Sequence, residues 1–127
     1  MENKIKPGLK RHDTETVTFD KTAASYESGT LEIYATPSMI SFMERTCLLS
    51  VEDYLPKEQT TVGTLVNIKH IKASKTGEII TCKSELVEID RRRLVFKVES
   101  NDSEGLIGHG IHERFIVDVD KFLGKIN

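Results

Sequence analysis

The sequence predicts an α+β domain in which one long, buried helix packs against an antiparallel sheet of about five strands. A helical apolar periodicity covers residues 36–55, and four later stretches alternate between polar and apolar residues with a period of two. The connections between these stretches are short, and strands joined by short loops pair antiparallel because parallel pairs need a long crossover. With 127 residues, the chain is expected to form a single domain, residues 1–127.

The helix is predicted to begin at Thr36, whose side chain can cap the free amides of the first turn, with Pro37 at a position that suits proline. It is predicted to end at about Leu55, because Pro56 stops it. One broad arc of the helix is apolar and the opposite side is polar, so we expect a largely buried helix. The arc consists of Met39, Ile40, Met43, Cys47, Val51, Tyr54 and Leu55.

The sheet and its connections follow from the remaining pattern. Residues 21–30 are small and polar and are predicted to form a loop, and residues 119–126 form a short amphipathic tail. One helix covers one face of such a sheet and leaves an edge open, so we expect a homodimer that joins two sheets edge to edge. The layout fits a hotdog fold, and the pattern leaves a cystatin-like or ferredoxin-like domain open. Strands are predicted at 14–20, 61–72, 78–90, 93–100 and 106–118.

The composition excludes several classes of protein. Eighteen basic and twenty acidic side chains give a net charge of −2, without the broad positive surface of a dedicated nucleic-acid binder. No apolar run approaches the ~18 residues that cross a bilayer, and the charged start has no apolar core, so we expect neither a membrane partner nor a signal peptide. Cys47 and Cys82 lack CxxC spacing, which predicts reduced, buried thiols in a cytoplasmic protein.

Two polar residues occupy predicted apolar faces. Glu44 lies one helical turn from Ile40 and Cys47, where a carboxylate loses hydration unless a partner compensates. His70 ends an apolar row on the strand 61–72. Glu44 fits a structural carboxylate with a buried partner, and His70 fits a partly buried histidine at a strand end. As a pair, they also fit the general acid and base of an active-site cleft.

The histidines near the end of the chain do not predict a metal site. His109 and His112 are three residues apart on a predicted strand, so they point to opposite faces and cannot reach one ion. Gly108 and Gly110 predict a close approach of backbone or ligand on their face. Arg114 shares that face, where it suits a carboxylate, a phosphate or an ordinary cross-strand ion pair.

Four segments of the chain resemble the fluoroacetyl-coenzyme A thioesterase-like group of the hotdog-fold thioesterases. They occur in the order and spacing of that family, and the resemblance covers residues 10–125. The segments are YATPSMISFMERTC (34–47), TTVGTLVNIKHIKAS (60–74), SELVEIDRRRLVFKVES (84–100) and IGHGIHERFIVD (107–118).

This resemblance implies a homodimer that hydrolyses a short-chain acyl-CoA thioester at two interface sites, with coenzyme A as part of the substrate and no separate cofactor. It implies catalytic residues at Thr36, Glu44 and His70, and substrate-binding residues at Gly63 and Arg114. Glu44 would activate a water or attack the thioester carbonyl, and His70 would orient the carbonyl or protonate the departing thiolate. Thr36 would polarise the carbonyl together with helix-start amides, and Arg114 would hold the geometry of the site's carboxylate.

One segment departs from the family's pattern. The fluoroacetyl-specific enzyme covers its pocket with a phenylalanine-bearing lid, whereas residues 24–30 here are small and polar, with Tyr26 as their one aromatic side chain. We therefore expect thioesterase chemistry without fluoroacetyl selectivity. Two alternatives stay open at this stage. One is a non-catalytic acyl-CoA-binding homodimer, and the other is a hotdog enzyme with another acyl-CoA chemistry, such as a hydratase.

Overall fold

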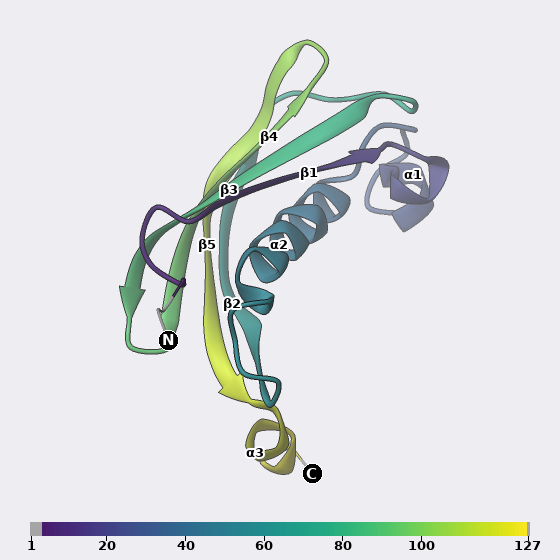
Figure 1. Cartoon of the computed structure of the whole chain (residues 1–127). Coiled ribbons are helices and arrows are strands. Elements are labelled where there is room, and N and C mark those ends of the chain that lie inside the picture. Colours follow the sequence, from purple (N-terminus) through teal and green to yellow (C-terminus); the bar gives the residue numbers. More distant parts are fainter. Residues whose placement is uncertain (1–3, 127) are drawn as a thin grey trace.

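The computed structural model describes residues 4–126, and within them a curved antiparallel sheet wraps around one long helix, α2 (Thr36–Glu52) (Figure 1). The strand order across the sheet is β1-β3-β4-β5-β2. Consecutive strands β3, β4 and β5 are neighbours, as their short connections predict. The strands are β1 (Lys10–Thr16), β2 (Gln59–His70), β3 (Ile79–Asp90), β4 (Arg93–Asp102) and β5 (Gly105–Asp118).

Three short helical elements flank this frame. A 3-10 turn, η1 (Phe19–Lys21), and helix α1 (Ala23–Tyr26) lie beside the start of α2, and helix α3 (Val119–Gly124) lies at the opposite end of the sheet (Figure 1). The prediction of an irregular loop over 21–30 missed α1, whose N-cap is Thr22 accepting a hydrogen bond from the Ser25 amide at 3.2 Å. No helix within residues 4–126 is long and apolar enough to cross a membrane.

The core lies between α2 and the concave face of the sheet. The helix ends at Glu52, earlier than predicted, so Tyr54 is 47% exposed and does not extend the apolar face. Phe42, outside the predicted arc, is buried at its edge. The buried helix residues pack on alternate residues of the strands, which are Ile80, Cys82, Leu86, Leu94, Phe96, Val98 and Ile107.

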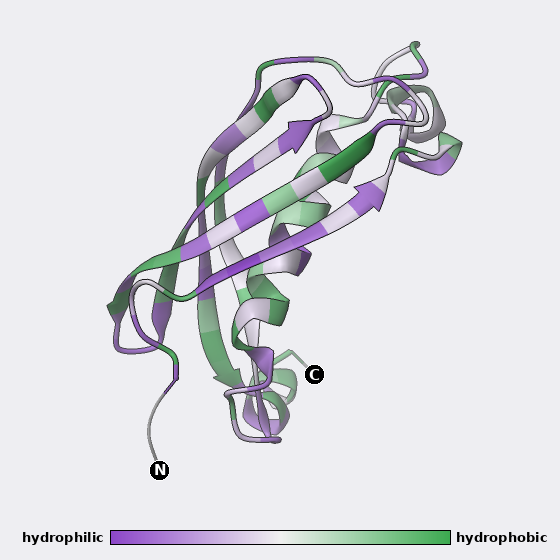
Figure 2. Cartoon of the chain, turned by 45° about the horizontal axis from the view of Figure 1, so that its top comes forward, coloured by the Kyte–Doolittle hydropathy of each residue, from purple (hydrophilic) through white to green (hydrophobic). Residues whose placement is uncertain are grey.

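The first strand lies four residues earlier than predicted, at Lys10–Thr16 where the alternation indicated 14–20. Its sequence, KRHDTET, contains no apolar residue, and it is hydrophilic along its whole length (Figure 2). The alternation at 14–20 suggested a strand, but pairing with β3 stops at Thr16, and Phe19 lies in η1 with its side chain exposed. An edge strand needs no apolar row, because backbone pairing with β3 is sufficient to hold it.

Strand β2 forms the other edge of the sheet, and its outer side is open. Residues 63–67 are exposed in succession, with Leu65 at 41% and Val66 at 44%. A bulge at Thr64 shifts the pairing with β5 by one residue: Gly63 pairs with Arg114, and Leu65, two residues later, pairs with Glu113. An apolar edge of this kind is a surface that folded proteins normally cover.

Of the two glycines singled out in β5, Gly110 confirms the predicted close approach of backbone, and Gly108 meets a core side chain. A β-carbon on Gly110 would collide with the backbone of Asn67 and Ile68 in β2. A β-carbon on Gly108 would lie 2.5 Å from the Met39 sulfur, so this glycine makes room for a core side chain of α2.

Candidate functional site

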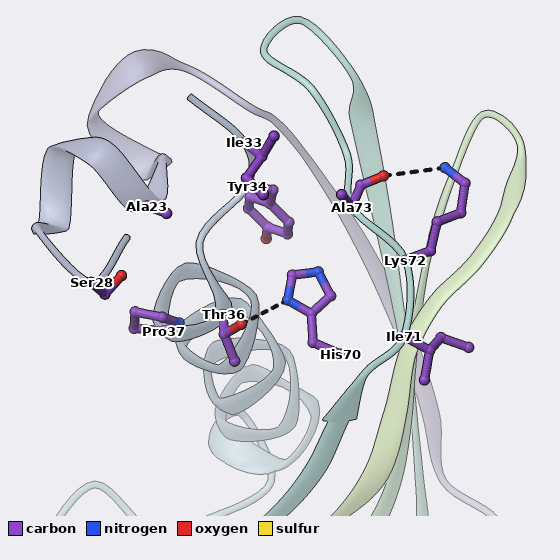
Figure 3. Close-up of a pocket in the computed structure, with 10 residues that line it drawn as sticks. All are labelled: Ala23, Ser28, Ile33, Tyr34, Thr36, Pro37, His70, Ile71, Lys72 and Ala73. Atoms are coloured by element: carbon purple, nitrogen blue, oxygen red, sulfur yellow. Dashed lines mark hydrogen bonds between the residues drawn. The ribbon is translucent and has the colours of Figure 1, made fainter. Parts of the chain in front are cut away.

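Thr36 and His70 meet at the start of α2. The Thr36 hydroxyl lies 2.8 Å from His70 Nδ1, and both side chains line an open pocket of about 370 Å³ (Figure 3). The predicted N-cap role of Thr36 is wrong: Ala35 is the N-cap, Thr36 is the first helical residue, and its hydroxyl is directed at His70. The remaining wall of the pocket comes from Ala23, Ser28, Ile33, Tyr34, Pro37, Ile71, Lys72 and Ala73.

The environment of His70 favours a neutral imidazole. Desolvation lowers the pKa of His70 below 6.5, against a smaller opposing effect from the Lys72 backbone. The second ring nitrogen, Nε2, is buried and has no hydrogen-bond partner within residues 4–126. The ring lies edge-on to Tyr34, whose buried hydroxyl donates a 2.6 Å hydrogen bond to Glu15. A neutral histidine with one unused nitrogen is suited to exchange a proton with a bound substrate.

A second cluster of polar side chains forms around Gly63 of β2. Its member on α2 is Glu44, which lies two helical turns after Thr36. A β-carbon on Gly63 would lie 2.9 Å from Glu44 Oε2, 3.2 Å from His112 Cε1 and 3.5 Å from Arg114 Nη1. Glycine therefore leaves just enough room here for three polar side chains to converge. The half-buried Glu44 carboxylate has no hydrogen bond or ion pair with the residues that the structure describes.

Arg114 lies beside Glu44 at Gly63, but the groups that hold it within residues 4–126 are not carboxylates. Its guanidinium donates to the Thr61 hydroxyl at 2.8 Å, to the Thr61 carbonyl at 2.9 Å and to His112 Nε2 at 3.1 Å. The side chain is buried, and desolvation lowers its pKa, although a guanidinium stays ionised. The site thus contains a buried cation whose hydrogen-bond partners are neutral. Its positive charge can attract Glu44 or a bound anion.

His112 is the member of this cluster that the sequence did not identify as functional. It is fully buried, and its Nδ1 lies 2.8 Å from the Leu65 carbonyl, which can only accept, so Nδ1 carries the proton. Nε2 accepts from Arg114, which can only donate. Burial lowers the pKa of His112, and the Arg114 charge lowers it further. His112 is thus a neutral brace between the β2 bulge and Arg114.

The predicted site residues form two groups in the single chain. Thr36 and His70 are in contact, and Glu44, Gly63 and Arg114 surround the second position, roughly 12 Å farther along the helix. No group of three or more metal-ligand side chains occurs within residues 4–126. A reaction that needs all three proposed catalytic side chains therefore requires the two groups to be brought together.

Residues 24–30 place no aromatic side chain over the pocket, whose one aromatic lining residue before α2 is Tyr34. Ala23 and Ser28 line it, whereas Tyr26 is 51% exposed and borders a separate groove beside Arg45. The mouth of the Thr36–His70 pocket is thus bounded by small side chains on this side (Figure 3).

The two histidines predict a pH-dependent stability. Because the pKa values of His70 and His112 are lowered by burial, the unfolded chain binds protons below about pH 6.5 that the folded chain does not. The free energy of unfolding in urea should therefore be smaller at about pH 5.5 than at about pH 7.5. His112→Gln should reduce this difference, and equal values at both pH values would contradict the prediction.

The sequence is similar to that of known fluoroacetyl-CoA thioesterases. The model of a family described as fluoroacetyl-CoA-specific thioesterase matches residues 17–120. A fluoroacetyl-CoA thioesterase from Streptantibioticus cattleyicolor is 33% identical over 95 residues, which cover 75% of this chain and 68% of the relative.

Solved structures agree with this comparison. The structure of the fluoroacetyl-CoA thioesterase FlK superposes with a TM-score of 0.90 and 28% identity, covering 96% of this chain and 95% of that one. A hot-dog-like protein from Thermanaerovibrio acidaminovorans superposes with a TM-score of 0.88 at 18% identity, covering 94% of this chain and 89% of its own. The fold is therefore the hotdog fold, as predicted.

Proposed function

Because the chain belongs to the family of fluoroacetyl-CoA-specific thioesterases, we propose that it hydrolyses a short-chain acyl-CoA thioester to the free acid and coenzyme A. The observation that carries this proposal is the pair of polar clusters, a Thr36–His70 pair on an open pocket and a carboxylate beside a buried cation. Membership of the family makes the protein a thioesterase, which favours hydrolysis over a purely binding role or a hydratase.

The proposed mechanism assigns a separate role to each side chain. Glu44 supplies the carboxylate that activates a water or attacks the carbonyl carbon itself, and both routes need it ionised. The C–S bond then breaks, and the proton that Glu44 removes from the water passes through His70 to the departing thiolate, so that the imidazole is neutral before and after the step. In the second route, water hydrolyses the acyl–Glu44 anhydride after the thiolate has left, which releases the free acid and restores the carboxylate. The Thr36 hydroxyl, at the positive end of α2, stabilises the oxyanion that forms on the carbonyl. No cofactor enters this scheme, since coenzyme A is the leaving group.

A homodimer would unite the two clusters. Two copies of the exposed β2 edge can pair antiparallel about a two-fold axis. This single self-complementary contact covers the β2 edge of each copy. If the axis passes between Val66 and Asn67, near the end of the exposed stretch, His70 lies opposite Gly63 of the partner subunit. Glu44 and Arg114 of the partner subunit then approach the Thr36–His70 pair. We propose that each active site forms in this way at the interface.

The space around Gly63 supports a short acyl group. A single added carbon there would already crowd Glu44 and His112, so the second cluster has little room for a long chain. The small side chains of residues 24–30 support turnover of fluoroacetyl-CoA and acetyl-CoA at similar rates, because the one aromatic residue of this stretch, Tyr26, does not line the pocket.

The test is thiol release from a panel of acyl-CoA thioesters that contains acetyl, fluoroacetyl, butyryl and palmitoyl groups. We expect the highest kcat/KM on a short member and a ratio of fluoroacetyl to acetyl turnover near one. Tight binding of all members without thiol release would contradict the proposed hydrolysis. A palmitoyl preference would contradict the short-chain assignment alone.

A further inference from the structure

A buried carboxylate at the end of β4 connects the two segments that carry Thr36 and His70. The Asp102 side chain is 1% exposed, and its Oδ2 accepts from Lys72 Nζ at 2.7 Å and from Ser74 Oγ at 2.8 Å. Its Oδ1 accepts from the Glu104 amide at 2.8 Å. Both side-chain donors, Lys72 and Ser74, belong to the segment that follows His70 at the end of β2.

The same segment is bonded to the chain just before α2. The Ser74 carbonyl accepts a 2.8 Å hydrogen bond from the amide of Tyr34, two residues before Thr36, and Ile33 pairs with Lys75. A path of direct contacts therefore runs from Asp102 through Ser74 to the start of the helix. A second path runs from Asp102 through Lys72, which lies two residues beyond His70.

The sheet ladder alone does not provide this connection. The pairing of β2 with β5 ends at His70 and Gly108, and the ladder bonds that follow it within residues 4–126 run from the Ile71 and Lys72 amides to the Ile107 carbonyl. We propose that Asp102 is a positioning residue for the hydrolysis: its bonds to Lys72 and Ser74 hold the His70 imidazole against the Thr36 hydroxyl. This inference rests on the proposed catalytic roles of Thr36 and His70.

The charge state of Asp102 supports a permanent connection. Burial by itself raises the pKa of this carboxyl, but the bonds from Lys72, the Glu104 amide and Ser74 outweigh it and lower the pKa to about 2. The carboxylate therefore keeps its charge, and its bonds, throughout the pH range in which an imidazole changes its protonation.

The test compares Asp102→Asn with Glu78→Gln. Glu78 is the matched control, because it accepts two bonds from Ser103, at 2.7 and 3.0 Å, beside Asp102, but has no side-chain bond to residues 70–74. We expect Asp102→Asn to lower kcat by roughly tenfold with little change in KM, and Glu78→Gln to leave kcat within about twofold. Ser74→Ala, which removes one bond, should show a smaller loss and serves if Asp102→Asn does not fold.

An NMR titration of the His70 ring provides a readout that a merely structural role would not change. Removal of a nearby negative charge alone would lower the pKa of His70, whereas loosening of the segment hydrates the ring and raises the pKa toward 6.5. We expect a rise in Asp102→Asn and none in Glu78→Gln. An unchanged or lowered pKa together with unchanged kcat would overturn the proposal. The titration needs no substrate and reports only on how the His70 ring is held. Full activity of His70→Ala would therefore refute the catalytic role of His70, which is a separate result from the outcome of the titration.

Discussion

Glu44→Gln should lower kcat by roughly 10²–10⁴-fold while the protein stays folded. The amide keeps the size of the side chain, so the packing against Gly63, His112 and Arg114 is preserved. It removes the negative charge on which both routes depend, because an amide neither deprotonates a water nor forms an anhydride. The measurement is thiol release at saturating acyl-CoA, with circular dichroism to confirm the fold.

Glu52→Gln is the matched control for this substitution. Glu52 lies two turns farther along α2, is half-buried, and accepts from the Thr60 hydroxyl at 3.1 and 3.2 Å outside the cluster around Gly63. It should keep nearly full kcat. Equal losses in the two variants would indicate a general effect of charge on the helix, and full activity in Glu44→Gln would remove Glu44 from the mechanism.

The fold was largely predictable where hydrophobic periodicity is strong. Helix α2 and strands β3 to β5 are buried on one face, so burial imposes a pattern on their sequence. Strand β1 carries no such pattern, since backbone pairing holds it at an edge. The end of α2 at Glu52 was also beyond prediction, because Pro56 sets a limit for the helix without setting its last residue.

The site was predictable as a set of residues and less so as an arrangement. Glu44 is noticeable as a charge on an apolar face and Arg114 as a charge on the face of Gly108 and Gly110, but the partner of each depends on cross-strand register. The bulge at Thr64 sets Gly63 opposite Arg114 and leaves the Leu65 carbonyl for His112. A sequence pattern does not reveal a one-residue shift of this kind, and the bracing role of His112 was missed for that reason.

Mixing two inactive variants should restore activity if the site forms between subunits. Glu44→Gln and His70→Ala are each expected to be nearly inactive. In a mixed dimer, one of the two sites combines the native His70 of one subunit with the native Glu44 of the other. Random exchange makes half of all dimers mixed, so the mixture should regain about a quarter of wild-type activity. A site contained within one chain would regain none, because every chain lacks one of the two side chains.

A second mixture is the control that makes this result decisive. Thr36 and His70 contact each other within one chain, so Thr36→Val mixed with His70→Ala leaves every site with one damaged partner of that pair. This mixture should stay inactive although its subunits exchange equally well, which native mass spectrometry can verify. Recovery of activity in both mixtures would mean that Thr36 and His70 of one chain serve different active sites. Recovery in neither mixture, with mixed dimers present, would refute the interface site. Because Gly63 and His70 lie on either side of the proposed axis between Val66 and Asn67, recovery in the first mixture alone is the outcome that this antiparallel pairing of two β2 edges requires.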